Sequence, residues 1–185
     1  MKPLRRWSTR STKKVFEHPL LDVEVRRLRD EDGAERDALV LDSPDWVNVI
    51  PLLERPGAEP GVVLVRQWRY ATATPTLEIP GGVVDPGEDA ATAATRELLE
   101  ETGYRAGRLE PLGWVHPNPA ILNNRCSIFL ATGLERVGEP EGDGEERIEV
   151  SVVPATALPA LVARGEITHA LVVAAFHLWH VHRAG

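Results

Sequence analysis

The segment from Asp89 to Thr102 is the clearest secondary-structure element of this 185-residue chain, and it limits what the rest can fold into. It is rich in Ala, Leu and Glu, which are strong helix formers, and Gly103 follows where a helix commonly ends. At roughly 100° per residue, three carboxylates share one face of this helix, those of Glu97, Glu100 and Glu101. Apolar side chains that we expect to face a core lie on the other side, on Ala91, Leu98 and Leu99.

The flanking sequence predicts a sheet for this helix to cover. Alternating or continuous apolar runs predict strands at 20–28, 38–41, 46–53, 62–70, 76–79, 108–115, 127–134 and 148–153. Two further helices are predicted at 157–163 and 169–183. The fold class is therefore α/β, a mixed sheet with helices on both faces. We expect two parts, an N-terminal β segment at 1–45 that forms a small antiparallel sheet and a main domain at 46–185.

Composition and charge limit the partners. Hydrophobic residues make up 43% of the chain, but the apolar runs are shorter than the ~18 residues of a membrane span. The net charge is -7, although the first 16 residues carry six bases and no acid, so the remainder is strongly acidic. An acidic body repels nucleic acid, and we expect neither a nucleic-acid nor a membrane partner. We expect residues 1–16 to be a solvated or dimer-packing segment.

Cysteine content is compatible with a reducing compartment. Cys126 is the single cysteine, so it can form neither an internal disulfide nor a cysteine-based zinc site. We expect it to be buried as a small apolar side chain, and we expect the protein to be cytoplasmic.

The three clustered carboxylates predict a cation site. Like charges on one face repel one another, and no lysine occurs after Lys14 to relieve them. Mg²⁺, or Mn²⁺ as the alternative, would do so because hard cations prefer oxygen ligands. Upstream, Gly81 and Gly82 allow close backbone approach, and Arg96 is placed to pair with Glu88. The competing interpretation is an exposed acidic helix without a ligand.

The spacing of these residues resembles the Nudix box. The pattern spans 23 residues and comprises Gly82, Glu88, Arg96, Glu97, Leu98, Glu100, Glu101, Gly103 and Tyr104. Its one departure is Tyr104, where the family usually has an aliphatic residue. The resemblance implies an α/β/α sandwich, with the box as loop–helix–loop. It also implies Mg²⁺-dependent hydrolysis of a nucleoside diphosphate linked to another group.

The resemblance also implies roles for individual residues. Glu97 and Glu101 would be the principal metal ligands, Glu100 a further ligand with a catalytic part, and the Gly81 carbonyl would complete the shell. Structural roles fall to four residues, Gly82, Glu88, Arg96 and Gly103. The general base would lie on a loop outside the box, at Glu146 in preference to Glu145. Exposed, solvated side chains are the competing interpretation of both.

Segments outside the box resemble ADP-ribose and nucleotide-sugar pyrophosphatases. They are 67–70, 77–82, the proline at 119 and 165–167. In that subfamily N-terminal strands are often exchanged between subunits, which implies a homodimer. Substrate contacts are then expected at Trp46, Arg69, Glu78 and Pro119; a packed aromatic residue is the alternative for Trp46 and a surface ion pair for Arg69. Hydrolysis of GDP-mannose, a dinucleotide or a damaged nucleotide stays open, as does a nucleotide sensor without turnover.

Overall fold

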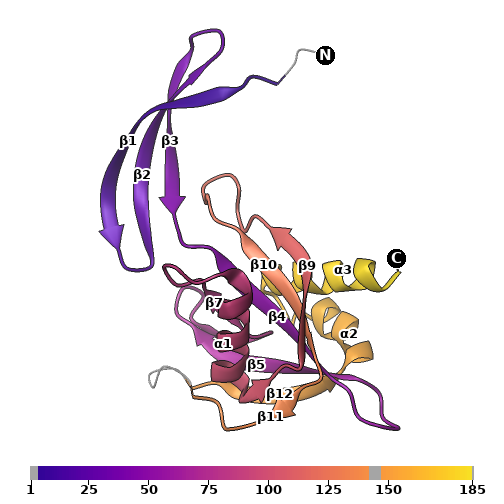
Figure 1. Ribbon diagram of the computed structural model, residues 1–185. Coiled ribbons are helices and arrows are strands. Elements are labelled where there is room, and N and C mark those ends of the chain that lie inside the picture. Colours follow the sequence, from indigo (N-terminus) through magenta and orange to yellow (C-terminus); the bar gives the residue numbers. More distant parts are fainter. Residues whose placement is uncertain (1–3, 142–146, 185) are drawn as a thin grey trace. The chain divides into compact units, whose positions relative to one another are not determined.

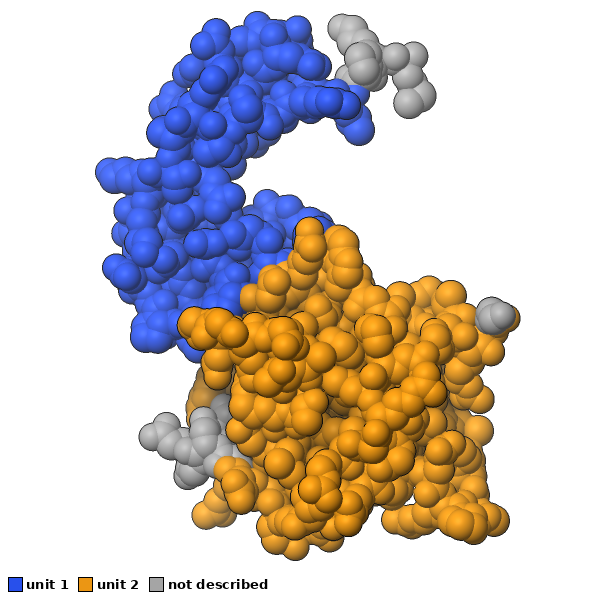
Figure 2. Space-filling model, viewed as in Figure 1, with its two compact units in different colours: residues 1–44, 116–124 blue, residues 45–115, 125–185 orange. Residues whose placement is uncertain are grey.

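The computed structural model describes residues 4–141 and 147–184, and their contacts divide the chain into two compact units. Unit 1 comprises residues 1–44 and 116–124, and unit 2 comprises 45–115 and 125–185; Figure 2 colours them separately. Glu145 and Glu146 lie outside the described residues. Within those residues, no helix has the length and apolar character needed to cross a membrane.

Unit 1 is built on a three-stranded antiparallel sheet, in the order β1 (Trp7–His18), β2 (Leu21–Asp30) and β3 (Glu35–Asp42). The segment 116–124 joins it through the amide of Leu41, which donates to the carbonyl of Ile121 at 2.7 Å. Every residue of β1 is exposed, and several large apolar side chains are also exposed, those of Val15, Phe16, Leu20 and Leu39. This unit therefore has little core of its own.

Unit 2 contains a seven-stranded mixed sheet (Figure 1). Its main path runs through β12 (Glu149–Pro154), β5 (Gly61–Arg69), β4 (Trp46–Leu53), β10 (Cys126–Thr132) and β9 (Arg108–Val115). Two short strands attach to it, β6 (Thr74–Glu78) on β5 and β7 (Gly81–Val83) on β4. The pair β4–β10 is parallel and all other pairs are antiparallel. A separate two-stranded ribbon joins β8 (Tyr104–Arg105) to β11 (Glu135–Arg136).

Helices cover both faces of this sheet. On one face, α1 (Ala90–Thr102) packs Ala93, Ala94 and Leu98 against alternate residues of β4 and β10. On the other, α2 (Leu158–Ala163), which follows a 3₁₀ turn at Ala155–Ala157, and α3 (Ala170–Ala184) bury the larger of two core clusters. Successive strand residues point to opposite faces, so β4 and β10 contribute to both clusters.

The predicted α/β fold class is confirmed, and so is the burial of Cys126. One local prediction was wrong, and one strand was missed. Ala91 and Leu99 are exposed, because the helix turns Ala93 and Ala94 rather than these residues toward the sheet. Strand β1 was not predicted, because its run of Ser, Thr and Lys lacks apolar alternation.

Candidate metal centre

Local capping fixes the ends of α1. The carboxylate of Asp89 accepts hydrogen bonds from the amides of Ala91 and Thr92, both at 2.9 Å, which lowers its pKa. At the other end Gly103 adopts a left-handed conformation with φ 71°, and its amide donates to the carbonyl of Leu99. Asp89 and Gly103, the two residues that flank the helix in sequence, thus determine where α1 begins and ends.

The glycine loop approaches two of the three carboxylates. The amide of Gly81 donates to Oε2 of Glu101 at 3.0 Å. A Cβ atom on Gly82 would lie 2.3 Å from Oε1 of Glu97, so only glycine leaves that carboxylate where it is. A Cβ atom on Gly81 would lie 2.2 Å from the carbonyl oxygen of Val47, because β7 lies against β4. Gly82 thus lies close to the side chain of Glu97, whereas Gly81 lies close to the backbone of β4.

Arg96 ties the acidic residues to the loop. Its guanidinium donates to Glu88 at 3.2 and 3.0 Å, and also to the carbonyl of Val83 at 3.0 Å. The same group donates to Glu97 at 2.8 Å and to Glu100 at 3.1 Å. The ion pair predicted between Arg96 and Glu88 is present. Arg96 also contacts two of the predicted metal ligands, in keeping with its sequence position at the border of the acidic face next to Glu100.

Burial makes the carboxylates costly to ionise. Glu101 is 9% exposed, and its burial raises the pKa to about 8. Burial also raises the pKa of Glu97, although hydrogen bonds from Arg96 oppose the shift. Glu100 is more accessible, with its side chain 45% exposed. Glu97 and Glu101 are therefore the two carboxylates of the face that gain most from a nearby cation.

The chemistry of these donors fits a hard divalent cation, because they supply only oxygen. Among residues 4–141 and 147–184, however, no three His, Cys, Asp or Glu side chains converge as a ready-made metal-binding group. Arg96 lies between Glu97 and Glu100, and the amide of Gly81 holds Glu101. Arg96 now neutralises the carboxylates of Glu97 and Glu100, and a bound cation would either add to this charge or take the place of the guanidinium.

A second polar cluster surrounds Glu78, which is 2% exposed. Arg69 donates to its carboxylate at 2.9 and 2.7 Å, and Thr76 donates as well. Burial alone would raise the pKa of Glu78, but these hydrogen bonds hold it below its ordinary value. The charge of Arg69 also lowers the pKa of Glu101, so the cluster is electrostatically coupled to the carboxylate helix.

Two members of this cluster were missed. Thr76 precedes Glu78 by two residues on β6 and therefore shares its face, a signal that the sequence did contain. The Nδ1 atom of His169 lies 3.8 Å from Oε2 of Glu78 and is buried without a hydrogen bond among the described residues. The sequence does not predict that His169 lies beside Glu78, because this contact depends on how the segment before α3 packs.

The remaining predicted substrate contacts are Trp46 and Pro119. Trp46 is partly buried and packs against the core cluster on the α2–α3 face. Pro119 is exposed and belongs to unit 1, whereas the carboxylates belong to unit 2. Roles for both in substrate binding stay predictions.

Without divalent cations, the free energy of unfolding should fall as the pH rises from about 4.5 to about 8. Glu101 retains its proton over this range in the folded state and loses it in the unfolded state, so deprotonation favours unfolding. Glu101→Gln should flatten the slope. Urea unfolding in EDTA between pH 5 and 8.5 measures this, and equal slopes for the two proteins would contradict the assignment.

Fold and site together define an α/β sandwich protein with an acidic loop–helix–loop on one face of its sheet. Residues 44–176 match the NUDIX domain model, and the chain belongs to the Nudix family. The predicted family is thus confirmed.

Individual relatives agree with this assignment. The chain is 35% identical to the ADP-sugar pyrophosphatase of Mus musculus over 133 residues, 69% of this chain and 61% of that protein, less than two thirds of its length. It is 28% identical to the ADP-ribose pyrophosphatase of Bacillus subtilis over 146 residues, 78% of this chain and 77% of that one. These relatives support placement in the ADP-ribose pyrophosphatase-like subfamily.

A solved structure shares the fold of nearly the whole chain. A crystal structure described as an ADP compounds hydrolase superposes with a TM-score of 0.82, covering 97% of this chain and 95% of that one. At 24% sequence identity this likeness concerns the fold alone.

Proposed function

We propose that this protein hydrolyses the pyrophosphate bond of ADP-ribose or a related nucleoside diphosphate sugar, giving a nucleoside monophosphate and a sugar phosphate. One observation carries the proposal: within a Nudix domain, Glu97 and Glu101 are held at the Gly81–Gly82 loop with their pKa values raised by burial. Relatives named ADP-sugar and ADP-ribose pyrophosphatase support the substrate class. A cytoplasmic location is part of the same proposal.

Glu97, Glu100 and Glu101, with the carbonyl of Gly81, would hold Mg²⁺, or Mn²⁺ in its place. The bound cation would neutralise the diphosphate and supply an activated water. Arg96 keeps the carboxylate face joined to the loop through Glu88 and Val83. The chain's own part is thus to hold the carboxylates in place, at a cost in burial that Arg96 and the Gly81 amide offset in part and a bound cation would offset further.

Substrate orientation would come from outside the helix. Arg69 is partly exposed and carries a positive charge toward the site, while Glu78 fixes its guanidinium. Trp46 would contact the base, and Pro119 would be a further substrate contact. The general base would be Glu146, with Glu145 as the alternative.

The partner we propose besides the substrate is a second copy of this chain, packed on unit 1. Exposed apolar side chains on its strands and on the turn between β1 and β2 support this, because such residues are commonly buried in interfaces; they are Val15, Phe16, Leu20 and Leu39. Light scattering of the full chain should give a dimer mass, and Phe16→Asp should shift it toward the monomer. A monomeric wild type would refute the dimer without affecting the hydrolysis.

The substrate proposal is tested by a panel of ADP-ribose, ADP-glucose, UDP-glucose, GDP-mannose and diadenosine compounds with Mg²⁺. Added phosphatase releases phosphate from the monoester products, while the intact diphosphate diesters resist it. We expect the largest release from ADP-ribose. A larger release from GDP-mannose would change the substrate, and binding of all compounds without release would favour a nucleotide sensor.

Replacing Gly82 by alanine should impair turnover without unfolding the protein. The new Cβ atom displaces the end of the Glu97 side chain, which can rotate away, and a shift of about 1 Å at a reacting centre can cost about 10²-fold in rate. Gly81→Ala is the matched comparison: it meets the backbone of β4 and should cost about 2 kcal/mol of stability. Kinetics and thermal unfolding of both variants separate the effects. Normal turnover in Gly82→Ala would contradict the place given to Glu97.

A further inference from the structure

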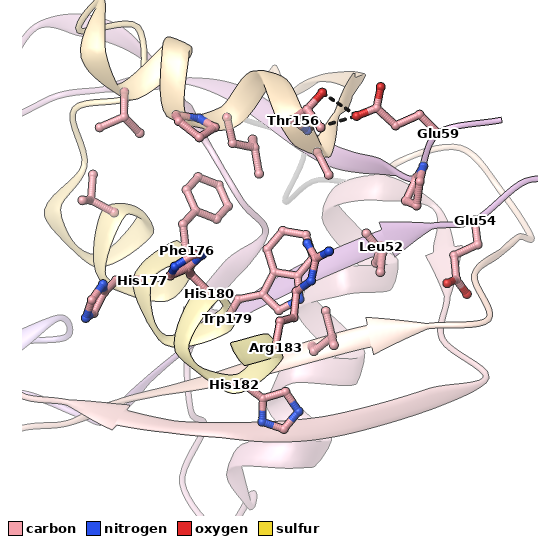
Figure 3. Close-up of a pocket in the computed structure, with 17 residues that line it drawn as sticks. Leu52, Glu54, Glu59, Thr156, Phe176, His177, Trp179, His180, His182 and Arg183 are labelled. Atoms are coloured by element: carbon pink, nitrogen blue, oxygen red, sulfur yellow. Dashed lines mark hydrogen bonds between the residues drawn. The ribbon is translucent and has the colours of Figure 1, made fainter. Parts of the chain in front are cut away.

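Unit 2 contains a cavity of about 950 Å³ on the α2–α3 side of its sheet, separate from the carboxylate helix. Leu130 of β10 lines it, whereas the neighbouring Phe129 and Ala131 pack on the α1 side. Leu52 of β4 also lines it, and α3 contributes Phe176 and Trp179 (Figure 3). The two sites thus lie on opposite faces of the same two strands.

Size and lining are those of a small-molecule site. Pockets for drug-sized ligands typically measure about 300–1,000 Å³ and have mainly apolar walls with a few polar groups. Here the apolar walls come from strands and from both helices of this face, with Leu158 and Val162 from α2. Trp179, only 6% exposed, contributes an aromatic ring to the lining. An apolar ligand body therefore finds contacts on several sides.

Arg183 supplies the charge at this cavity. Its guanidinium lies over the Trp179 ring, 5.2 Å from the centroid. Among the described residues, Arg183 makes no hydrogen bond or ion pair, so its N–H groups remain able to hold an anion. His177 and His180 line the cavity from the same helix.

The acidic lining residues lie apart from the two histidines. Figure 3 shows Glu54 and Glu59 on the side away from His177 and His180. Glu59 already accepts hydrogen bonds from the amide and hydroxyl of Thr156. The cavity therefore combines apolar walls with a cation, Arg183, that lies beside an aromatic ring and has no hydrogen-bond or ion-pair partner within residues 4–141 and 147–184.

We propose that this cavity binds a small apolar anion, a flat hydrocarbon body with one acidic group. The body would pack on Trp179, Phe176 and Leu130, and the acidic group would accept paired hydrogen bonds from Arg183. Ligands of the same shape without the negative charge would bind more weakly. Arg183 would repel a cationic ligand, and a neutral ligand would lack the charge attraction to Arg183.

Calorimetry of the full chain with 2-naphthoate tests the proposal, with 2-naphthalenemethanol and 2-naphthylmethylamine as neutral and cationic counterparts. We expect one naphthoate per chain, bound at least about tenfold more tightly than either counterpart, since a hydrogen bond to a charged group contributes about that factor. No binding at millimolar concentration, or equal binding of all three, would overturn the proposal.

Two pairs of variants locate the site. Val173 lines the cavity and is 37% exposed, so Val173→Trp should project an indole ring into the cavity and weaken naphthoate binding at least about tenfold. Val181, on the same helix but not among the lining residues, serves as control in Val181→Trp. Arg183→Gln should abolish the preference for the anion, whereas Arg105→Gln, in the β8–β11 ribbon, should not. Unchanged binding in Val173→Trp or unchanged preference in Arg183→Gln would refute the assignment.

Discussion

Replacing Glu101 by glutamine should lower kcat for nucleotide-sugar hydrolysis by about 10³-fold or more while the protein still folds, as loss of one preorganised electrostatic contact alone can cost 10²–10³-fold. Glutamine keeps the volume of the buried side chain, and its amide oxygen can still accept from the amide of Gly81. It cannot supply a negative charge to a cation. Glu97→Gln should behave alike, because Glu97 is the other buried carboxylate of this face.

Mg²⁺ titration and steady-state kinetics on the same preparations check this result. Glu135→Gln is the control, because Glu135 is an exposed carboxylate whose partner Arg105 lies on the two-stranded ribbon. It should keep wild-type turnover. Near-normal activity of Glu97→Gln or Glu101→Gln would refute the proposed metal ligands, and with them the hydrolytic mechanism.

Arg96→Ala should destabilise the protein by about 3 kcal/mol, the scale expected when one partner of a half-buried ionic network is removed. The substitution removes the ionic partner of Glu88 and the hydrogen bond to the carbonyl of Val83. It also removes the positive charge that reduces the repulsion between Glu97 and Glu100. For a chain of this length the melting temperature should fall by roughly 6–12 °C. Activity should fall as well, because the loop is no longer tied to the helix.

Denaturant unfolding of Arg96→Ala is compared with Arg105→Ala, which removes an exposed ion pair and should cost less than about 1 kcal/mol. Arg96→Lys should recover only part of the loss, since an ammonium group cannot make the several planar contacts of the guanidinium. Equal stability of Arg96→Ala and Arg105→Ala would show that the network has no structural role.

The parts of the fold that follow local rules were predictable. Asp89 and Gly103 cap the two ends of α1 through hydrogen bonds to residues two to four positions away in the sequence. The apolar runs of β4 and β5 likewise predict strands that are buried. The spacing of Glu88 and Arg96 was likewise sufficient to predict their pairing, because loop and helix are adjacent in the chain.

What could not be predicted depends on tertiary packing. Position 82 requires glycine because a carboxylate fifteen residues later occupies the space of its side chain, a contact that no local pattern encodes. Arg69 and Glu78 pair although the register of β5 and β6 sets Arg69 opposite Thr74 and Glu78 opposite Val65, because both side chains lie on the same face of the sheet and the long arginine side chain reaches along it. The apolar cavity beside Trp179 arises from how two helices and a sheet meet, although each was predicted singly.

The parallel register of β4 and β10 has a consequence for the order in which this chain folds. In this register Cys126 lies opposite Trp46. Two neighbouring strands at the middle of the sheet therefore come from segments that are far apart in the sequence. Contacts of such long range carry a large loop-closure entropy and slow the folding reaction. During synthesis, Gly81, Gly82 and the whole of α1 emerge before β10 does. The acidic helix therefore has only half of its docking surface until that strand arrives, and a nascent chain stopped before residue 126 would contain all three carboxylates proposed to hold the cation with only part of the platform that buries them.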